Sequence, residues 1–217
     1  MENKTIAYSL LLAVILALPC CKKENPVEAP LKVKSQGEIR EEEKNAVIKT
    51  VLEDGKVVYQ ERSLFVVVSS TINILEILGS SSFEPPNVDA FMQGIANSFS
   101  KKKNIAIPPE VLRDFVGTNQ TRKPCTVSHA SKKVVLLSEE ELVAIFSEGE
   151  YESFYEKYPG SAGYIRFSDV GFNDNFTVAL VYVEEFANST GAGGGMVFLE
   201  KAEARWVVKG FVYLWAS

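Results

Sequence analysis

A cysteine and the only histidine of the chain lie four positions apart and form the first candidate for a catalytic site. Cys125 and His129 lie in the polar stretch CTVSH, and a thiolate beside an imidazole can act as a nucleophile with its general base. Such pairs normally need a third group that orients the base, and the sequence does not identify one. A cysteine and a histidine in a polar loop are more often solvated bystanders. A thiol-dependent hydrolase is therefore the alternative function, and no catalytic residue is assigned.

Two other polar stretches have residue types that bind ligands. The segment SDVGFNDN holds Asp169, Asn173 and Asp174, whose oxygens suit a hard cation, but the spacing is not that of an EF-hand and turn chemistry explains these residues equally well. The glycine-rich stretch GAGGG at 191–195 lacks the ending of a phosphate-binding P-loop. We expect it to form a hairpin turn with positive φ, with close approach to a ligand as the alternative. No metal and no cofactor are expected.

Two adjacent cysteines follow an apolar run near the N-terminus. Residues 6–18 are almost wholly apolar, and these thirteen residues are fewer than the roughly 20 that span a bilayer. The length is typical of the apolar region of a signal peptide. The run ends in Leu-Pro-Cys-Cys, which resembles the lipobox of bacterial lipoproteins. That resemblance implies thioether lipidation of a cysteine, cleavage before it, and acylation of the new amine.

Cys21 is the expected lipidation site. It has Leu18 at position −3 and the small Cys20 at −1, whereas Cys20 would have Ala17 and Pro19 at those positions. The alternative is a secreted or inner-membrane-tethered protein with an incidental cysteine pair. Two or three acyl chains anchor a protein firmly to a membrane. We therefore expect the protein to be anchored by lipid in the bacterial cell envelope, on the periplasmic or the surface side.

Length and composition favour one folded domain after this anchor. The chain has 217 residues, of which 46% are hydrophobic and 24% charged, as in ordinary globular proteins. We expect a lipoprotein signal peptide at 1–20, a flexible tether at 21–38 and a single α+β domain at 39–217. The net charge of −5 excludes a typical nucleic-acid binder, because the densest basic cluster is only the stretch at 100–104.

Hydrophobic periodicity places helices before strands. Helical patterns lie at 39–55, 87–99, 108–116, 138–149 and 151–158, with a β-branched strand at 64–78 whose second half can be helical, a short strand at 132–137, and a polar loop at 117–131. From residue 163 the period changes to two, which predicts strands at 163–168, 175–186, 195–202 and 205–215. The fold class is therefore α+β, with N-terminal helices packed on a C-terminal antiparallel β-meander of about four strands.

The last two expected features concern the faces of these strands. The alternation breaks near Ser168 and Asp169, which predicts a bulge or a strand end there. In the last strand, Trp206, Val208, Val212 and Leu214 are expected on one face. The opposite face would then carry the aromatic residues Phe211, Tyr213 and Trp215, which are candidates for an exposed surface.

The C-terminal third also resembles a known group of proteins. The pattern YPGS-G, FS-x-VGFN, ALVYV, LEK and a terminal W-x-S, spread over 151–217, is similar to that of uncharacterised bacterial envelope proteins and lipoproteins. The resemblance implies the same architecture, and it carries over no catalytic residues. We expect a membrane-anchored envelope lipoprotein that binds a protein or a small ligand and is not an enzyme; a thiol-dependent hydrolase is the alternative, and a purely structural role is the third possibility.

Overall fold

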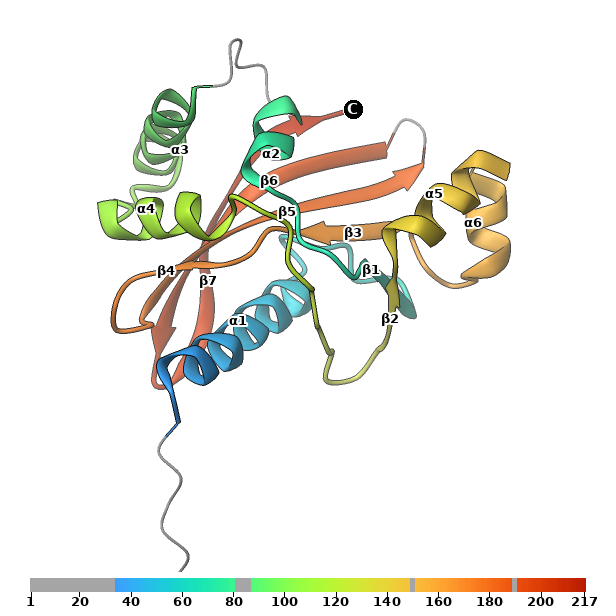
Figure 1. The fold of residues 1–217 in the computed structure, drawn as a ribbon, viewed down its shortest axis with the longest axis horizontal. Coiled ribbons are helices and arrows are strands. Elements are labelled where there is room, and N and C mark those ends of the chain that lie inside the picture. The colour runs from blue at the N-terminus through green and yellow to red at the C-terminus, as the bar shows by residue number, and fades with distance from the viewer. Residues whose placement is uncertain (1–33, 81–86, 149–150, 189–190) are drawn as a thin grey trace, which may run out of the picture. The chain divides into compact units, whose positions relative to one another are not determined.

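A mixed β-sheet runs through the part of the chain that the computed structural model describes, which is residues 34–80, 87–148, 151–188 and 191–217 (Figure 1). The strands are β1 (Leu64–Val68), β2 (Lys133–Leu137), β3 (Tyr164–Phe167), β4 (Gly171–Phe172), β5 (Val178–Asn188), β6 (Gly191–Ala202) and β7 (Arg205–Ala216). Their order across the sheet is β2-β1-β3-β5-β6-β7, and β4 pairs with β5. β2, β1 and β3 are parallel, and the pairs from β3 to β7 are antiparallel.

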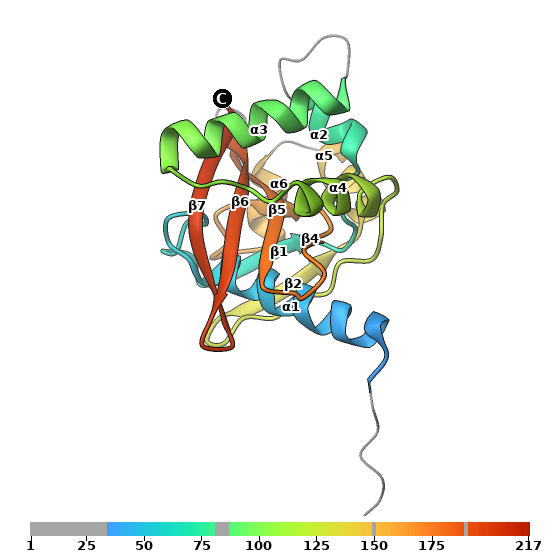
Figure 2. The same cartoon turned by 90° about the vertical axis from the view of Figure 1, so that its left-hand side faces the viewer.

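Helices cover both faces of this sheet. They are α1 (Gln36–Glu53), α2 (Ile74–Ser80), α3 (Val88–Lys103), α4 (Pro109–Thr118), α5 (Glu139–Glu148) and α6 (Tyr151–Lys157). Figure 2 shows α1 on one side of the sheet and α3 with α4 on the other. α5 and α6 pack over β1 and β2, on the face that α1 does not cover.

The fold is a mixture of α and β, as expected, and β3, β5, β6 and β7 pair antiparallel in chain order, but the sheet is larger than the expected four-stranded meander. β1 and β2 join this sheet through parallel pairing and β4 pairs with β5, so the described part of the sheet has seven strands. All five residues of β1 are buried, because this strand lies between two neighbours and under helices on both faces. A continuous apolar run is typical of such a parallel strand. A parallel partner must be reached by a crossover connection, which here contains α2, α3 and α4.

Three apolar clusters hold the layers together. The first lies under α1, where Val47, Ile48, Val51 and Leu52 are fully buried as their helical spacing predicts. The second joins α2, α3 and α4 to β5, β6 and β7, and the third joins α5 and α6 to β1 and β2.

Local signals account for the helix ends. α1 begins at Gln36, three residues before the expected start at Ile39, because Ser35 and Glu38 form a capping box. Ser138 caps α5, because its hydroxyl accepts the N–H of Glu141 at 3.1 Å. The described residues contain no helix long and apolar enough to cross a membrane.

Candidate functional site

The structure places Cys125 in the core and not in an open loop. Its side chain is 1% exposed in the cluster beneath α1, and its N–H donates to the Ser69 carbonyl at 2.8 Å. Burial raises the pKa of the Cys125 thiol to about 11. The thiolate is the nucleophilic form, so the thiol in this position is inert at neutral pH.

The imidazole of His129 has other partners. Its Nδ1 accepts the N–H groups of Ser131 and Lys132, both at 3.1 Å, and its ring stacks on Phe65 with centroids 5.1 Å apart. Burial lowers the pKa of His129, which favours the neutral form. The histidine thus closes the turn before β2, and its Nδ1 has no free lone pair for the proton of Cys125.

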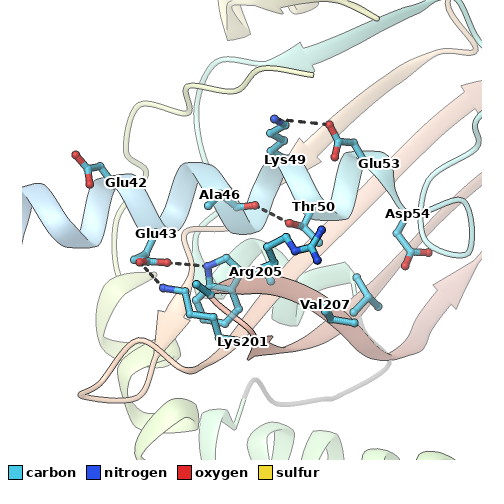
Figure 3. Close-up of a pocket in the computed structure, with 13 residues that line it drawn as sticks. Glu42, Glu43, Ala46, Lys49, Thr50, Glu53, Asp54, Lys201, Arg205 and Val207 are labelled. Atoms are coloured by element: carbon cyan, nitrogen blue, oxygen red, sulfur yellow. Dashed lines mark hydrogen bonds and ion pairs between the residues drawn. The ribbon is translucent and has the colours of Figure 1, made fainter. Parts of the chain in front are cut away.

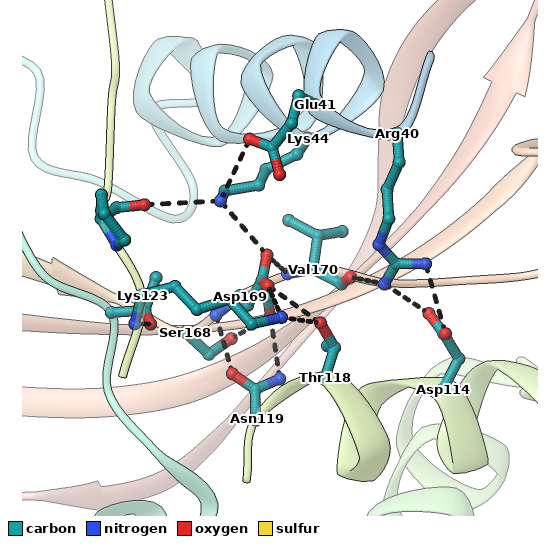
Figure 4. A network of polar contacts seen from close by, with 12 residues as sticks. Arg40, Glu41, Lys44, Asp114, Thr118, Asn119, Lys123, Ser168, Asp169 and Val170 are labelled. Atoms are coloured by element: carbon teal, nitrogen blue, oxygen red, sulfur yellow. Dashed lines mark hydrogen bonds and ion pairs between the residues drawn. The ribbon is translucent and has the colours of Figure 1, made fainter. Parts of the chain in front are cut away.

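Asp169, the strongest of the candidate cation ligands, lies in a buried network of polar contacts (Figure 4). Its Oδ2 accepts from Lys123 Nζ at 2.7 Å and from Thr118 Oγ1 at 2.8 Å, and its Oδ1 lies 3.5 Å from Lys44 Nζ. Burial opposes its ionisation, but these donors outweigh that effect and lower the pKa of Asp169. The carboxylate is therefore saturated by protein donors, and it joins α1, α4 and the β3–β4 connection.

Asn173 and Asp174 do not join Asp169 in a cation site. The Asn173 side chain accepts the N–H groups of Thr177 and Val178 at 2.8 and 3.0 Å, which is turn chemistry. Within the described residues, no three His, Cys, Asp or Glu side chains lie close enough together to hold an ion.

The glycine-rich stretch is not the expected turn. Residues 191–195 belong to β6, and Gly193, Gly194 and Gly195 have no positive φ. Aromatic side chains explain the missing Cβ atoms: one on Gly194 would lie 2.4 Å from Tyr182 Oη, and one on Gly195 would lie 2.5 Å from the Phe211 ring. Gly194 therefore faces the α3 side, whereas Gly193, which pairs with Glu185, leaves bare backbone on the face of the sheet that carries α1.

The expected faces of β7 are also partly wrong, because two irregularities shift its register. Phe198 pairs with Gly210 and Leu199 pairs with Val208, so Lys209 is an extra residue, and Leu214 is a second one. Each bulge changes the face on which the following side chains lie. Trp206, Val208 and Phe211 therefore pack on the α1 side, whereas Val212 and Leu214 pack on the α3 side. Trp215 returns to the α3 side, where its Nε1 donates to Tyr182 Oη at 2.6 Å.

A cavity of about 650 Å³ lies between α1 and the hairpin of β6 and β7 (Figure 3). Seven of its thirteen lining residues are charged, and several of them are already paired. Glu43 accepts from Lys201 Nζ at 2.5 Å and from Trp206 Nε1 at 2.7 Å. We call it the α1–hairpin cavity. The contacts of Glu43 with Lys201 and Trp206 hold α1 against the hairpin.

A second cavity of about 500 Å³ lies further along β7 on the same face, and we call it the β7 cavity. Its lining residues are Val57, Tyr59, Arg62, Ala162, Val183, Glu185, Ala187, Gly191, Ala192, Gly193, Phe211, Tyr213, Ala216 and Ser217. Only Arg62 and Glu185 among them carry charged side chains. Such a lining, largely apolar with a few polar groups, is typical of a small-molecule site.

In the charged pair of the β7 cavity, Arg62 is buried and Glu185 is partly buried, with side chains 2% and 28% exposed. Arg62 Nη2 donates to Glu185 Oε1 at 2.7 Å, and Arg62 Nε donates to the Tyr59 carbonyl at 2.8 Å. Burial lowers the pKa of Arg62 and raises that of Glu185, and the attraction between the two side chains opposes both shifts. The guanidinium also lies over the Phe65 ring, 5.2 Å from its centroid.

The sequence reasoning missed Arg62 and Glu185. The signal that could have found them is the pair of acids in YVEEF, which closes an otherwise apolar strand, and the arginine just before the buried strand β1. The sequence did single out Phe211 and Tyr213, which line this cavity. It also offered, as an alternative, that a ligand approaches the glycine backbone at 191–195, and three residues of that stretch line the cavity. Cys20, Cys21 and the expected signal peptide at 1–20 lie outside the described residues.

No protein-family model, curated protein or solved structure matches the chain.

Proposed function

We propose that the chain is a lipid-anchored protein of the bacterial cell envelope whose folded part binds a ligand in the β7 cavity. The observation that carries the proposal is this cavity, which is largely apolar and built over the ion pair of the buried Arg62 and the partly buried Glu185. Its volume of about 500 Å³ lies within the range of small-molecule sites, which is roughly 300–1,000 Å³.

The N-terminal sequence supports the anchor. The apolar run at 6–18 and the Leu18-to-Cys21 spacing favour cleavage before Cys21 and acylation of that residue. The pattern at 151–217 supports membership of the envelope-protein group that it resembles. Its glycines Gly160 and Gly163 both have positive φ, at 83° and 96°, so at least this part of the pattern is demanded by the backbone.

Binding is a better supported function than the thiol-dependent hydrolase. A hydrolase would use Cys125 and His129, and Cys125 has a pKa raised to about 11 by burial. An activated cysteine is normally accessible and has a lowered pKa. The β7 cavity, by contrast, is lined by half-exposed aromatic side chains and needs no reactive group.

Two measurements test the proposal. In cell fractionation, the wild type should enter the membrane fraction and Cys21→Ala should leave it or accumulate uncleaved, whereas Cys20→Ala should behave as the wild type. Ligand-detected NMR with a mixed set of neutral and charged small organic fragments should detect binding to the wild type and weaker binding to Gly193→Val, which fills the β7 cavity. Unchanged fractionation of Cys21→Ala would contradict the lipid anchor. Fragments that bind the wild type and Gly193→Val equally would contradict ligand binding in the β7 cavity.

A further inference from the structure

We propose that the ligand of the β7 cavity is a flat, electrically neutral and largely apolar molecule that presents one acceptor oxygen, such as a ketone, an ester or an amide, to Arg62. This inference rests on the proposed function, because it names the chemical class that the same cavity would bind.

The acceptor is inferred from an incomplete set of hydrogen bonds on Arg62. Its Nε and Nη2 have partners, but Nη1 is buried and has none, although the side chain is only 2% exposed. Buried donors almost always have an acceptor, so an exception calls for one. In the described residues, two other side chains have such an atom, and of the three only Arg62 lines one of the cavities considered above.

The ligand should be neutral because the site already holds a balanced pair. Glu185 lies 2.7 Å from Arg62 and offsets its charge. Burial raises the pKa of Glu185, so the surroundings already disfavour negative charge there. An anionic ligand would add a second negative charge beside this carboxylate, whereas a carbonyl oxygen satisfies Nη1 without adding charge.

The flat shape follows from the walls of the cavity. Gly193 pairs with Glu185 across β5 and β6, so the two residues lie on the same face of the sheet. Because Gly193 has no side chain, the wall of the cavity beside Glu185 is bare backbone. Phe211 and Tyr213 meet edge to face, with centroids 4.5 Å apart. Tyr59 lies near the arginine, with its ring centroid 5.9 Å from the guanidinium carbon. Tyr59 and Tyr213 are 51% and 62% exposed, so both rings can turn toward an aromatic ligand, and a turn of the Tyr59 ring would uncover the arginine.

Prodan, 6-propionyl-2-(dimethylamino)naphthalene, is a suitable probe because it is flat, neutral, fluorescent and has one ketone. The matched probes are 2-(dimethylamino)naphthalene, which lacks the ketone, and 6-(dimethylamino)-2-naphthoate, which carries a negative charge. Fluorescence titration of the full-length protein should give affinity at least about tenfold higher for prodan than for either matched probe, as expected for one hydrogen bond to a charged donor. Equal affinity for prodan and the ketone-free probe, or tighter binding of the naphthoate, would overturn the inference.

Two variants locate the binding. Gly193→Val should weaken prodan binding at least about tenfold by filling the cavity. A Cβ on Gly193 would be 3.4 Å from its nearest neighbour, so the strand should accept it. Lys209→Val, which places the same side chain on β7 outside the lining, is the control and should bind as the wild type. The double variant Arg62→Leu/Glu185→Leu removes the pair without leaving either charge alone, and it should bind prodan and the ketone-free probe equally.

These arms separate the two claims. If fragments in the NMR experiment lose affinity for Gly193→Val but prodan shows no preference over its ketone-free analogue, the cavity binds and the proposed ligand class is wrong. If Gly193→Val changes the binding of neither the fragments nor the three probes, the binding function itself is wrong.

Discussion

Asp169→Asn should destabilise the protein strongly, because Asp169 is the main anionic partner of a buried lysine. The Lys44 side chain is 4% exposed, and it lies 3.5 Å from the Asp169 carboxylate. Its other anionic partner, Glu41, is 60% exposed at 3.4 Å, so solvent weakens that attraction. Removing one member of a buried ion pair costs about 3–5 kcal/mol. Since Glu41 remains, we expect a loss near the lower limit, about 3 kcal/mol in the free energy of unfolding.

The assay is urea denaturation at pH 7 followed by the fluorescence of Trp206 and Trp215, both of which lie in β7. Glu42→Gln is the control, because Glu42 pairs with Lys34 on the surface with side chains 59% and 54% exposed. That change should cost at most about 1 kcal/mol. A loss below about 1 kcal/mol for Asp169→Asn would refute the assignment of this network as a structural support, since exposed pairs contribute that little.

The dependence on pH gives the same prediction a second test. The pKa of Asp169 is lowered in the folded protein from its usual 3.8, so the carboxylate contributes stability above that value and loses it as pH falls through the folded pKa. The difference between wild type and Asp169→Asn should therefore be full at pH 7 and smaller at pH 3. An equal difference at both pH values would show that charge is not the cause.

Three further changes have direct outcomes. Gly195→Ala should cost about 1–3 kcal/mol in urea denaturation, because its Cβ would meet the Phe211 ring and a carbonyl oxygen at 2.5 Å; a neutral effect would contradict this packing. Gly117→Ala, at an exposed position of α4 where an added Cβ would meet no atom within 4 Å beyond its own helix, should raise the free energy of unfolding by up to about 1 kcal/mol, and destabilisation would contradict the open environment. Cys125, studied with Cys20 and Cys21 replaced by alanine, should react with a disulfide reagent at pH 8 far more slowly in the folded protein than in urea, because burial raises its pKa to about 11. Fast reaction in the folded state would revive the thiol mechanism.

Hydrophobic periodicity predicted the elements that are determined by residues close together in the chain. The apolar residues of α1, α3 and α4 recur on one face, and each helix forms where this pattern predicted it. The break in alternation at Ser168 and Asp169 is also real, because β3 ends at Phe167 and β4 begins at Gly171. These features depend on neighbours in the chain, which a single sequence displays.

Features that depend on distant partners could not be predicted in this way. The parallel pairing of Val66 with Val135 joins residues far apart in the chain, and nothing local specifies it. The extra residues Lys209 and Leu214 change the facing of β7, although the alternation of β7 looks regular in the sequence. Arg62 and Glu185 are likewise 123 positions apart, so their pair becomes visible only when β5 and the segment before β1 are side by side.

The central proposal is that a lipidated chain beginning at Cys21 carries the β7 cavity at a membrane. The most direct test is the intact mass of the protein extracted from the membrane fraction, measured for the wild type, Cys20→Ala and Cys21→Ala. We expect a chain that begins at residue 21 and carries a diacylglyceryl or triacyl mass in the wild type and Cys20→Ala, and no such mass in Cys21→Ala. An unmodified wild-type chain, or one still carrying residues 1–20, would contradict it.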